Sequence, residues 1–191
     1  SDLTFSTINV PSVTTLAATA IGWTTSTLNG TVNPNGSATN AWFEWGTTTA
    51  YGTNNSATPQ AMGSGTTAVT VTGYGITGLT ANTVYHFRLD ASNTAGTTNG
   101  ADLTFSTING PTATTNPATL IGATTSTLNG SVNPNGSATN AWFEWGTTTS
   151  YGSSNASTPQ AMGSGTTTVT VTGLNVTGLT GLTTYHFRLD A

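Results

Sequence analysis

The stretch VYHFRLDA (84–91) decides the fold class, because apolar and ionisable residues alternate along it. Tyr85, Phe87 and Leu89 fall on one side of an extended chain, and the ionisable residues between them fall on the other. A period of two with one apolar side predicts a half-buried β-strand rather than a helix.

The same alternation recurs in other short stretches of the chain. They are TLNGTVN (27–33), AWFEW (41–45), AVTVT (68–72) and DLTFST (102–107). Between the first two, NPNG (33–36) predicts a turn, since proline presets φ and glycine relieves the residue that follows. About seven short strands in a hundred residues are typical of a β-sandwich, so we expect an all-β fold.

A long internal repeat sets the domain organisation. Residues 1–91 align with residues 101–191 without a gap, and 70 of these 91 positions are identical. The period is the size of a whole domain rather than of a solenoid coil. The sequence therefore predicts a string of separate globular domains.

Two segments of the repeat resemble a known module. GLTANTVYHFRLDASNTAGTTNGADLTFST (78–107) resembles the end of a fibronectin type III domain of the bacterial extracellular type, and TLNGTVNPNGSATNAWFEWGTTTAYG (27–52) is similar to its B strand, turn and C strand. The resemblance implies tandem immunoglobulin-like β-sandwiches. It also implies a tyrosine corner, in which the Tyr85 hydroxyl bonds to backbone upstream, near Leu79.

The resemblance also implies where the domains begin and end. Residues 1–9 are expected to be a last strand, strand G, that belongs to a preceding or neighbouring domain. Residues 10–109 form a complete domain, and residues 110–191 form a second domain that lacks its final strand.

A sandwich without strand G leaves strand F as an unpaired edge, which is prone to aggregation. Either the chain is a window of a longer covalent array, or the first strand of one chain completes the last domain of another, by donor-strand addition. We expect self-association of one of these kinds. The donor residues of the second arrangement are Asp2, Leu3, Thr4, Phe5, Ser6, Thr7 and Ile8.

The composition excludes several classes of function. Charged residues make up 4% of the chain, against about 25% in typical soluble proteins. With two arginines and a net charge of −4, the chain is not expected to bind nucleic acid. No apolar run is long enough for membrane insertion, and the absence of cysteine excludes disulfides and thiolate metal sites. A surface rich in threonine and asparagine suggests an extracellular or cell-surface location.

Few residues are candidates for chemistry. His86 and His186 are the only histidines, and each lies in the same YHFRLD context. Serine and threonine are too abundant for a catalytic triad to be argued, so we expect no enzymatic activity and no cofactor. Asp90 and Asp102 are the only metal-ligand candidates in a repeat, and their spacing fits no calcium motif, so we expect no metal.

An outward cluster is expected on the neighbouring C and F strands. It consists of Trp42, Glu44, His86 and Arg88, with Asp90 also pointing outward. Glu44 and Arg88 should form a cross-strand ion pair, and the Trp42 ring should stack on Arg88 or His86.

Glycans are a further candidate partner. The N-glycosylation motif Asn-X-Ser/Thr occurs at Asn29, Asn35, Asn54, Asn129, Asn135, Asn155 and Asn175. In a chain with 48 threonines and 18 asparagines, many such motifs arise by chance.

These observations favour a structural repeat unit of an extracellular filament, stalk or adhesin. Two alternatives stay open. One is a carbohydrate- or surface-binding adhesin module that uses Trp42, and the other is an accessory domain of a secreted enzyme.

Overall fold

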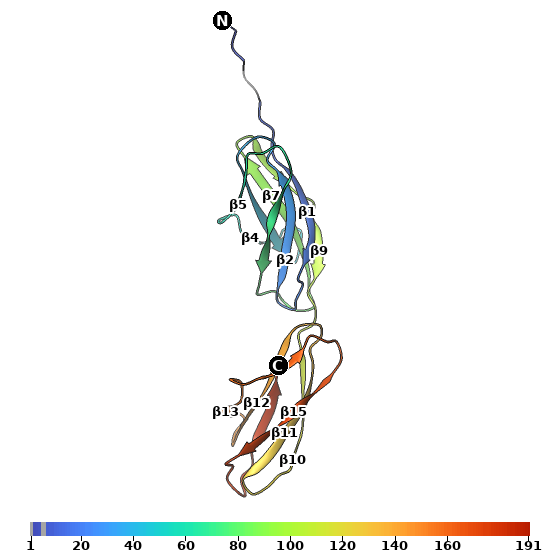
Figure 1. The fold of residues 1–191 in the computed structure, drawn as a ribbon, viewed down its shortest axis with the longest axis vertical. Coiled ribbons are helices and arrows are strands. Elements are labelled where there is room, and N and C mark those ends of the chain that lie inside the picture. The colour runs from blue at the N-terminus through green and yellow to red at the C-terminus, as the bar shows by residue number, and fades with distance from the viewer. Residues whose placement is uncertain (1, 5–6) are drawn as a thin grey trace. The chain divides into compact units, whose positions relative to one another are not determined.

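The computed structural model describes residues 2–4 and 7–191, which form strands and turns. They divide into two compact units, unit 1 ending at Ile108 and unit 2 beginning at Asn109 (Figure 1). Each unit is a sandwich of two antiparallel sheets, so the predicted all-β fold with two tandem sandwiches is confirmed. The described residues contain no helix that could cross a membrane.

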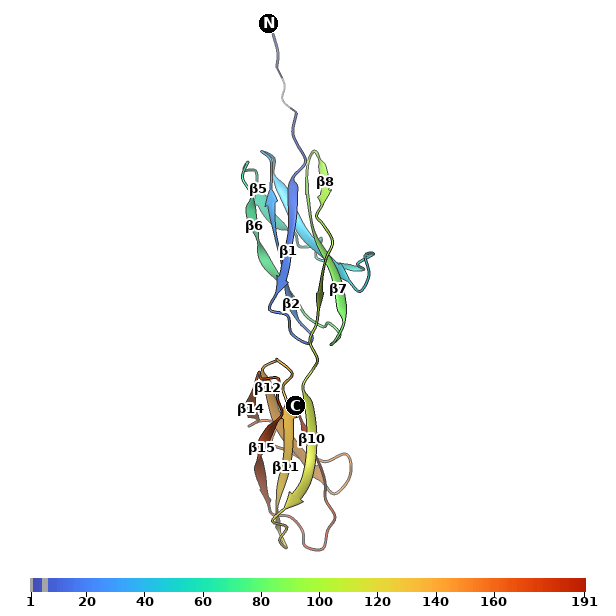
Figure 2. The ribbon, with the colours of Figure 1, turned by 90° about the vertical axis from the view of Figure 1, so that its right-hand side faces the viewer.

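Unit 1 packs one sheet of three strands against one of six. The first has the order β1-β2-β6; the second has the order β4-β3-β7-β8, with β5 also beside β3 and β9 beside β7 (Figure 2). The strands are β1 (Ser12–Thr19), β2 (Ser26–Asn33), β3 (Thr39–Gly46), β4 (Thr53–Asn54), β5 (Gln60–Gly63), β6 (Val69–Ile76), β7 (Val84–Asn93), β8 (Gly96–Asn99) and β9 (Leu103–Ser106).

The core of unit 1 follows from the period-two pattern. Leu28 and Val32 on β2, Phe43 on β3, and Phe87 and Leu89 on β7 are at most 1% exposed. Alternate residues of each strand face the opposing sheet, so the apolar members of the pattern meet between the sheets.

The last strand of unit 1 differs from the prediction. It consists of two pieces, β8 and β9, separated at Gly100, whose amide donates to the Leu89 carbonyl at 2.7 Å. The sequence pattern predicted only the second piece, because residues 96–99 lack an apolar alternation. With this split and the short β4 and β5, the described part of unit 1 has nine strands rather than about seven.

The tyrosine corner implied by the resemblance is present in unit 1. The Tyr85 hydroxyl accepts a hydrogen bond from the Thr80 amide at 3.0 Å. The Tyr85 ring stacks on Phe105 of β9, with centroids 5.6 Å apart. This contact fixes the chain where it enters β7.

Unit 2 repeats the arrangement up to the strand that corresponds to β7. One sheet has the order β10-β11-β15, and in the other β12 pairs with β13, β14 and β16. The strands are β10 (Thr112–Thr119), β11 (Thr125–Asn133), β12 (Thr139–Gly146), β13 (Ser153–Ser154), β14 (Gln160–Gly163), β15 (Val169–Thr177) and β16 (His186–Asp190).

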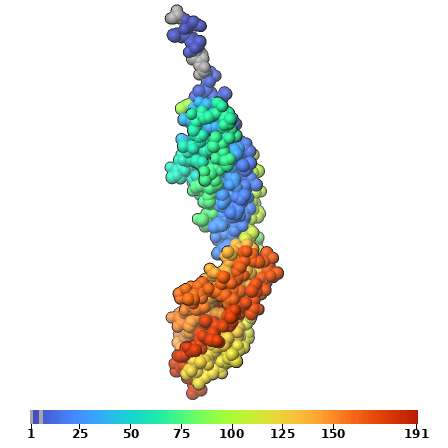
Figure 3. Space-filling model, viewed as in Figure 1, coloured from blue at the N-terminus to red at the C-terminus, as the bar shows by residue number. Residues whose placement is uncertain are grey.

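The described part of the N-terminal segment forms no strand within this single chain. Residues 2–4 and 7–9 are exposed (Figure 3), and the Asn9 carbonyl accepts a hydrogen bond from the Asn93 side chain at 2.8 Å. Leu3 is 89% exposed and Ile8 49%. Phe5 and Ser6, two of the predicted donor residues, lie outside the described residues, and the donor assignment stays a prediction.

Candidate functional site

The outer face of β3 and β7 carries a charged cluster in unit 1. Glu44 and Arg88 are directly opposite each other in the strand register, and Arg88 Nη2 lies 2.9 Å from Glu44 Oε2. Arg88 Nε also donates to the Asp90 carboxylate, at 3.1 Å. The arginine therefore bridges two carboxylates.

The aromatic ring beneath Arg88 is not the predicted one. The Arg88 guanidinium lies 4.9 Å from the centre of the Tyr51 ring. Trp42, predicted to stack on Arg88 or His86, lies opposite Asp90 in the register, and the cation–π contacts of the described residues involve Tyr51 and Tyr151 instead. Tyr51 has a left-handed backbone, with φ 56°, and this turn after β3 presents its ring to the arginine.

Asp90 faces outward, as predicted, but it is only 1% exposed. In the register it lies between Trp42 on β3 and Asn99 on β8, which cover it from both sides. Burial raises the pKa of Asp90 to about 6, although the charge of Arg88 opposes this rise. The alternation pattern predicted the direction of the side chain and not its burial.

His86 belongs to a second polar contact, which shares Tyr51 with the arginine cluster. Its Nδ1 lies 2.8 Å from Asp102 Oδ2, and the other carboxylate oxygen, Oδ1, accepts from the Tyr51 hydroxyl at 3.0 Å. Burial and then the hydrogen bond to Asp102 raise the pKa of Tyr51. A Ser-His-Asp triad also needs a hydroxyl bonded to the second ring nitrogen. No such hydrogen bond to His86 exists among the described residues.

Unit 2 repeats the arginine cluster but not the histidine contact. Arg188 pairs with Glu144 at 2.9 Å and with Asp190 at 3.0 Å, over the ring of Tyr151. In the described residues of unit 2, no carboxylate contacts His186. Asp102, which has this role in unit 1, precedes β9, and unit 2 shows no strand in that position.

The sequon asparagines differ in how their side chains are held. Four of them donate through the amide nitrogen to backbone carbonyls: Asn29, Asn35, Asn129 and Asn135. Asn155 is half-buried and accepts from the Phe143 amide. Asn54 and Asn175 are exposed, and their side-chain oxygens accept hydrogen bonds from Ser56 and Thr127, which leaves the nitrogen that would carry a glycan outside these contacts.

The most distinctive site is a groove in unit 2, at the place that β9 fills in unit 1. In unit 1, β7 pairs with β3 on one side and with β8 and β9 on the other. In unit 2, β16 pairs with β12, and its other edge has no strand among the described residues. Tyr185 and Phe187 are half-buried, whereas their counterparts Tyr85 and Phe87 are 8% and 0% exposed.

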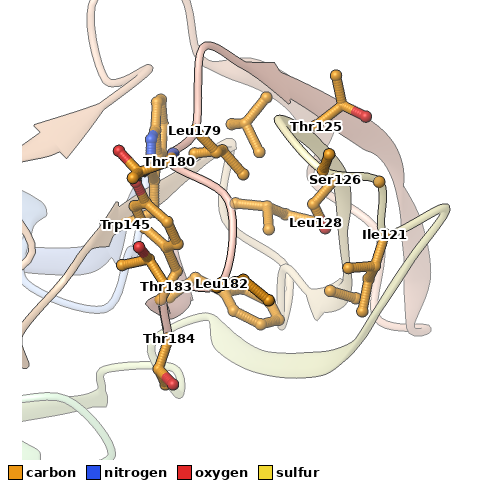
Figure 4. Close-up of a pocket in the computed structure, with 16 residues that line it drawn as sticks. Ile121, Thr125, Ser126, Leu128, Trp145, Leu179, Thr180, Leu182, Thr183 and Thr184 are labelled. Carbon is orange, nitrogen blue, oxygen red and sulfur yellow. Dashed lines mark hydrogen bonds between the residues drawn. The ribbon is translucent and has the colours of Figure 1, made fainter.

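The groove has a volume of about 400 Å³. Its lining includes Leu128, Trp145 and Leu179, and also the exposed residues Ile121 and Leu182 at its rim (Figure 4). Ile121 is 77% exposed, and Leu182 is fully exposed. An open apolar groove beside an unpaired strand edge can accept an extended peptide.

The alternation of apolar and polar residues did not predict the lining of this groove. The positions at which the two repeats differ could have indicated where it lies. Leu182 stands where unit 1 has Asn82, and Ala123 stands where unit 1 has Trp23. Both differences fall on the groove lining.

Comparisons with solved structures give likenesses of fold. The chain is similar to a two-domain fibronectin type III segment from chicken tenascin, with 16% identity and a TM-score of 0.31, over 95% of this chain and 90% of that chain. No family model matches the chain, and no curated protein matches it. The strand order of each unit, rather than this likeness, makes the chain a pair of fibronectin type III-like β-sandwiches.

Proposed function

We propose that this chain is a structural repeat unit of an extracellular filament, stalk or adhesin, built as a string of β-sandwiches. The sandwiches are joined through covalent tandem repeats or through head-to-tail strand addition. The sandwiches of this string are of the kind found in bacterial extracellular proteins.

One observation carries the proposal: the charged side chains of each sandwich are in contact with ionisable side chains of the same sandwich. Seven of the eight contact an ionisable partner within their own unit, namely Glu44, Arg88, Asp90, Asp102, Glu144, Arg188 and Asp190. Catalysis needs groups that are held ready for a substrate. Here these groups tie strands together, which supports a role that is not enzymatic and needs no cofactor.

The surface and the repetition support the same role. Most of the outer faces carry uncharged threonine, serine and asparagine. Asn54 and Asn175 offer accessible positions for glycans, which would keep a fibre of low charge soluble. Near-identical sandwiches suit a molecule whose length and surface matter more than a unique site.

Immunogold electron microscopy of the source cells, with an antibody against the chain, tests the proposal. We expect label along fibres or stalks outside the cell. Label confined to the cell interior would contradict it. Binding on a glycan array that is lost in Trp42→Ala, and retained in Trp23→Ala, would instead assign the chain to the carbohydrate-binding class.

A further inference from the structure

We infer that the groove of unit 2 binds residues 2–9 of a second copy of this chain, as a strand paired antiparallel to β16. The inference rests on the proposed function, since it names the partner that joins one pair of sandwiches to the next. Four observations support it. They are the identity of two sequence segments, the apolar lining of the groove, the backbone groups that Thr107 contacts in unit 1, and the aspartate Asp2.

The sequence identity is between the N-terminal segment and the strand that fills the same place in unit 1. LTFSTIN occurs at 3–9 and again at 103–109, where it contains β9. In unit 1, Ser106 lies opposite Val84, and the pairing continues to Leu103 opposite Phe87. The same register would place Ser6 of the second copy opposite Thr184.

The apolar lining of the groove matches the side chains of this segment. Phe105 is 6% exposed and contacts the rings of Tyr85 and Phe87, with centroid distances of 5.6 and 5.8 Å. The corresponding rings in unit 2, Tyr185 and Phe187, line the groove. Phe5 of the second copy would occupy the place that Phe105 has in unit 1.

The backbone contacts of Thr107 can also be repeated. Its hydroxyl donates to the Thr80 carbonyl at 2.7 Å and accepts from the Thr83 amide at 2.9 Å. Unit 2 has Thr180 and Thr183 at these positions, and both line the groove. The hydroxyl of Thr7 of the second copy would make the same two hydrogen bonds.

The fourth observation concerns the charge of Asp2. It is exposed and, alone among the eight charged residues, has no ionisable partner in the described structure. In unit 1 the corresponding Asp102 accepts hydrogen bonds from His86 and Tyr51. Unit 2 carries His186 and Tyr151 at those positions. Asp2 of a second copy therefore completes a contact that is absent among the described residues of unit 2, and fixes the register.

Two large apolar side chains of the groove lining are exposed. Ile121 is 77% exposed, and Leu182, which replaces Asn82 of unit 1, is fully exposed. Exposed apolar residues that gather at a groove are typical of a surface that another chain covers.

Cysteine cross-linking of the full chain tests the pairing, since the protein has no cysteine of its own. The variant Ser6→Cys with Thr184→Cys places a thiol on each side of the inferred register. Under mild oxidation we expect a ladder of multiples of 19.3 kDa on a non-reducing gel. The matched control, Thr4→Cys with Thr184→Cys, is two residues out of register, leaves His186 in place, and should cross-link at least tenfold more slowly.

A competing peptide identifies the occupant. Peptide SDLTFSTIN in excess should abolish the ladder, whereas the same peptide with Phe5→Asp should not. The Asp2→Asn peptide should need about tenfold higher concentration, the loss expected for one charge-assisted contact. Circular dichroism of each reduced variant verifies that it is folded.

Three results would overturn the inference: a folded double variant that stays monomeric, a control that cross-links equally fast, or a ladder that the peptide does not compete away. Monomers would leave the proposed function standing through a covalent array. Absence of label on extracellular fibres would contradict that function whatever the gel shows.

Discussion

Asp90 and Asp190 occupy the same position in the two sandwiches but differ in their surroundings. The side chain of Asp90 is 2% exposed, and that of Asp190 is 24% exposed. Asn99 on β8 lies opposite Asp90, and no strand covers Asp190 among the described residues of unit 2. The environment of this carboxylate therefore depends on a strand that is far away in the sequence.

The raised pKa of Asp90 predicts how the stability of unit 1 depends on pH. Because the folded-state pKa of about 6 is above the ordinary value of 3.8, the folded state binds more protons than the unfolded state between these values. The contribution of Asp90 to stability is therefore largest at low pH and falls as the pH rises through this window.

Replacing the carboxylate should remove this dependence. From pH 4 to pH 7, the unfolding free energy of Asp90→Asn should rise relative to wild type by about 2 kcal/mol, since most of the shift from 3.8 to about 6 is felt within this range. Denaturant unfolding at a series of pH values measures the difference. A difference that stays constant, or changes in the opposite direction, would contradict the assignment.

At the scale of the element, strands with one buried face were predictable and strands with none were not. β2 and β7 alternate apolar and polar residues because one side of each meets the opposing sheet, and this pattern is visible in the sequence. β4 and β8 pair through their backbones with exposed or half-buried polar side chains, so no apolar period marks them.

The contacts of the candidate sites also divide into those that the sequence predicts and those that it does not. The pairing of Glu44 with Arg88 followed from strands that are neighbours in the fold, whereas the contact of Arg88 with Tyr51 depends on the conformation of a turn. The repeated LTFSTIN predicted a donor strand, but not the volume of the groove that would accept it or the exposure of Ile121 and Leu182 beside it. Those features depend on residues from several strands of unit 2.

The break between β8 and β9 depends on a glycine. A Cβ at Gly100 would lie 2.5 Å from the Thr15 hydroxyl and 2.7 Å from the Leu89 carbonyl, both of which are held in the sheet contacts of unit 1. Gly100→Ala should therefore destabilise unit 1 by about 1–3 kcal/mol, the range for overpacking.

Gly65 gives the matched control for this change. It has no neighbour within 4 Å of an added Cβ, and its φ is not positive, so Gly65→Ala should change the stability little. Thermal unfolding of the two variants measures the difference. Equal melting temperatures would show that the close approach at Gly100 is not required.

At the scale of the whole molecule, two sandwiches of nearly the same sequence differ in how completely their cores are covered. Unit 1 buries Leu79, Tyr85, Phe87 and Phe105. In unit 2 the first three of these positions are half-buried, and the fourth has no counterpart in a described strand. Because apolar burial is the main stabilising term, unit 2 should be the less stable sandwich.

This difference predicts two unfolding transitions with different dependence on protein concentration. If unit 2 binds residues 2–9 of another copy, its apparent stability should rise with concentration, by about 2.7 kcal/mol when the free chain is at a hundred times its dissociation constant. The stability of unit 1, whose own β9 completes its sheet, should not change.

Hydrogen exchange followed by mass spectrometry resolves the stabilities of the two units, since peptides from β7 and β16 report on each unit separately. Chains at low and high concentration should differ in the protection of β16 and not of β7, and SDLTFSTIN peptide added to dilute chain should reproduce the effect. Equal protection of β16 at all concentrations would mean that unit 2 is stable without a partner strand.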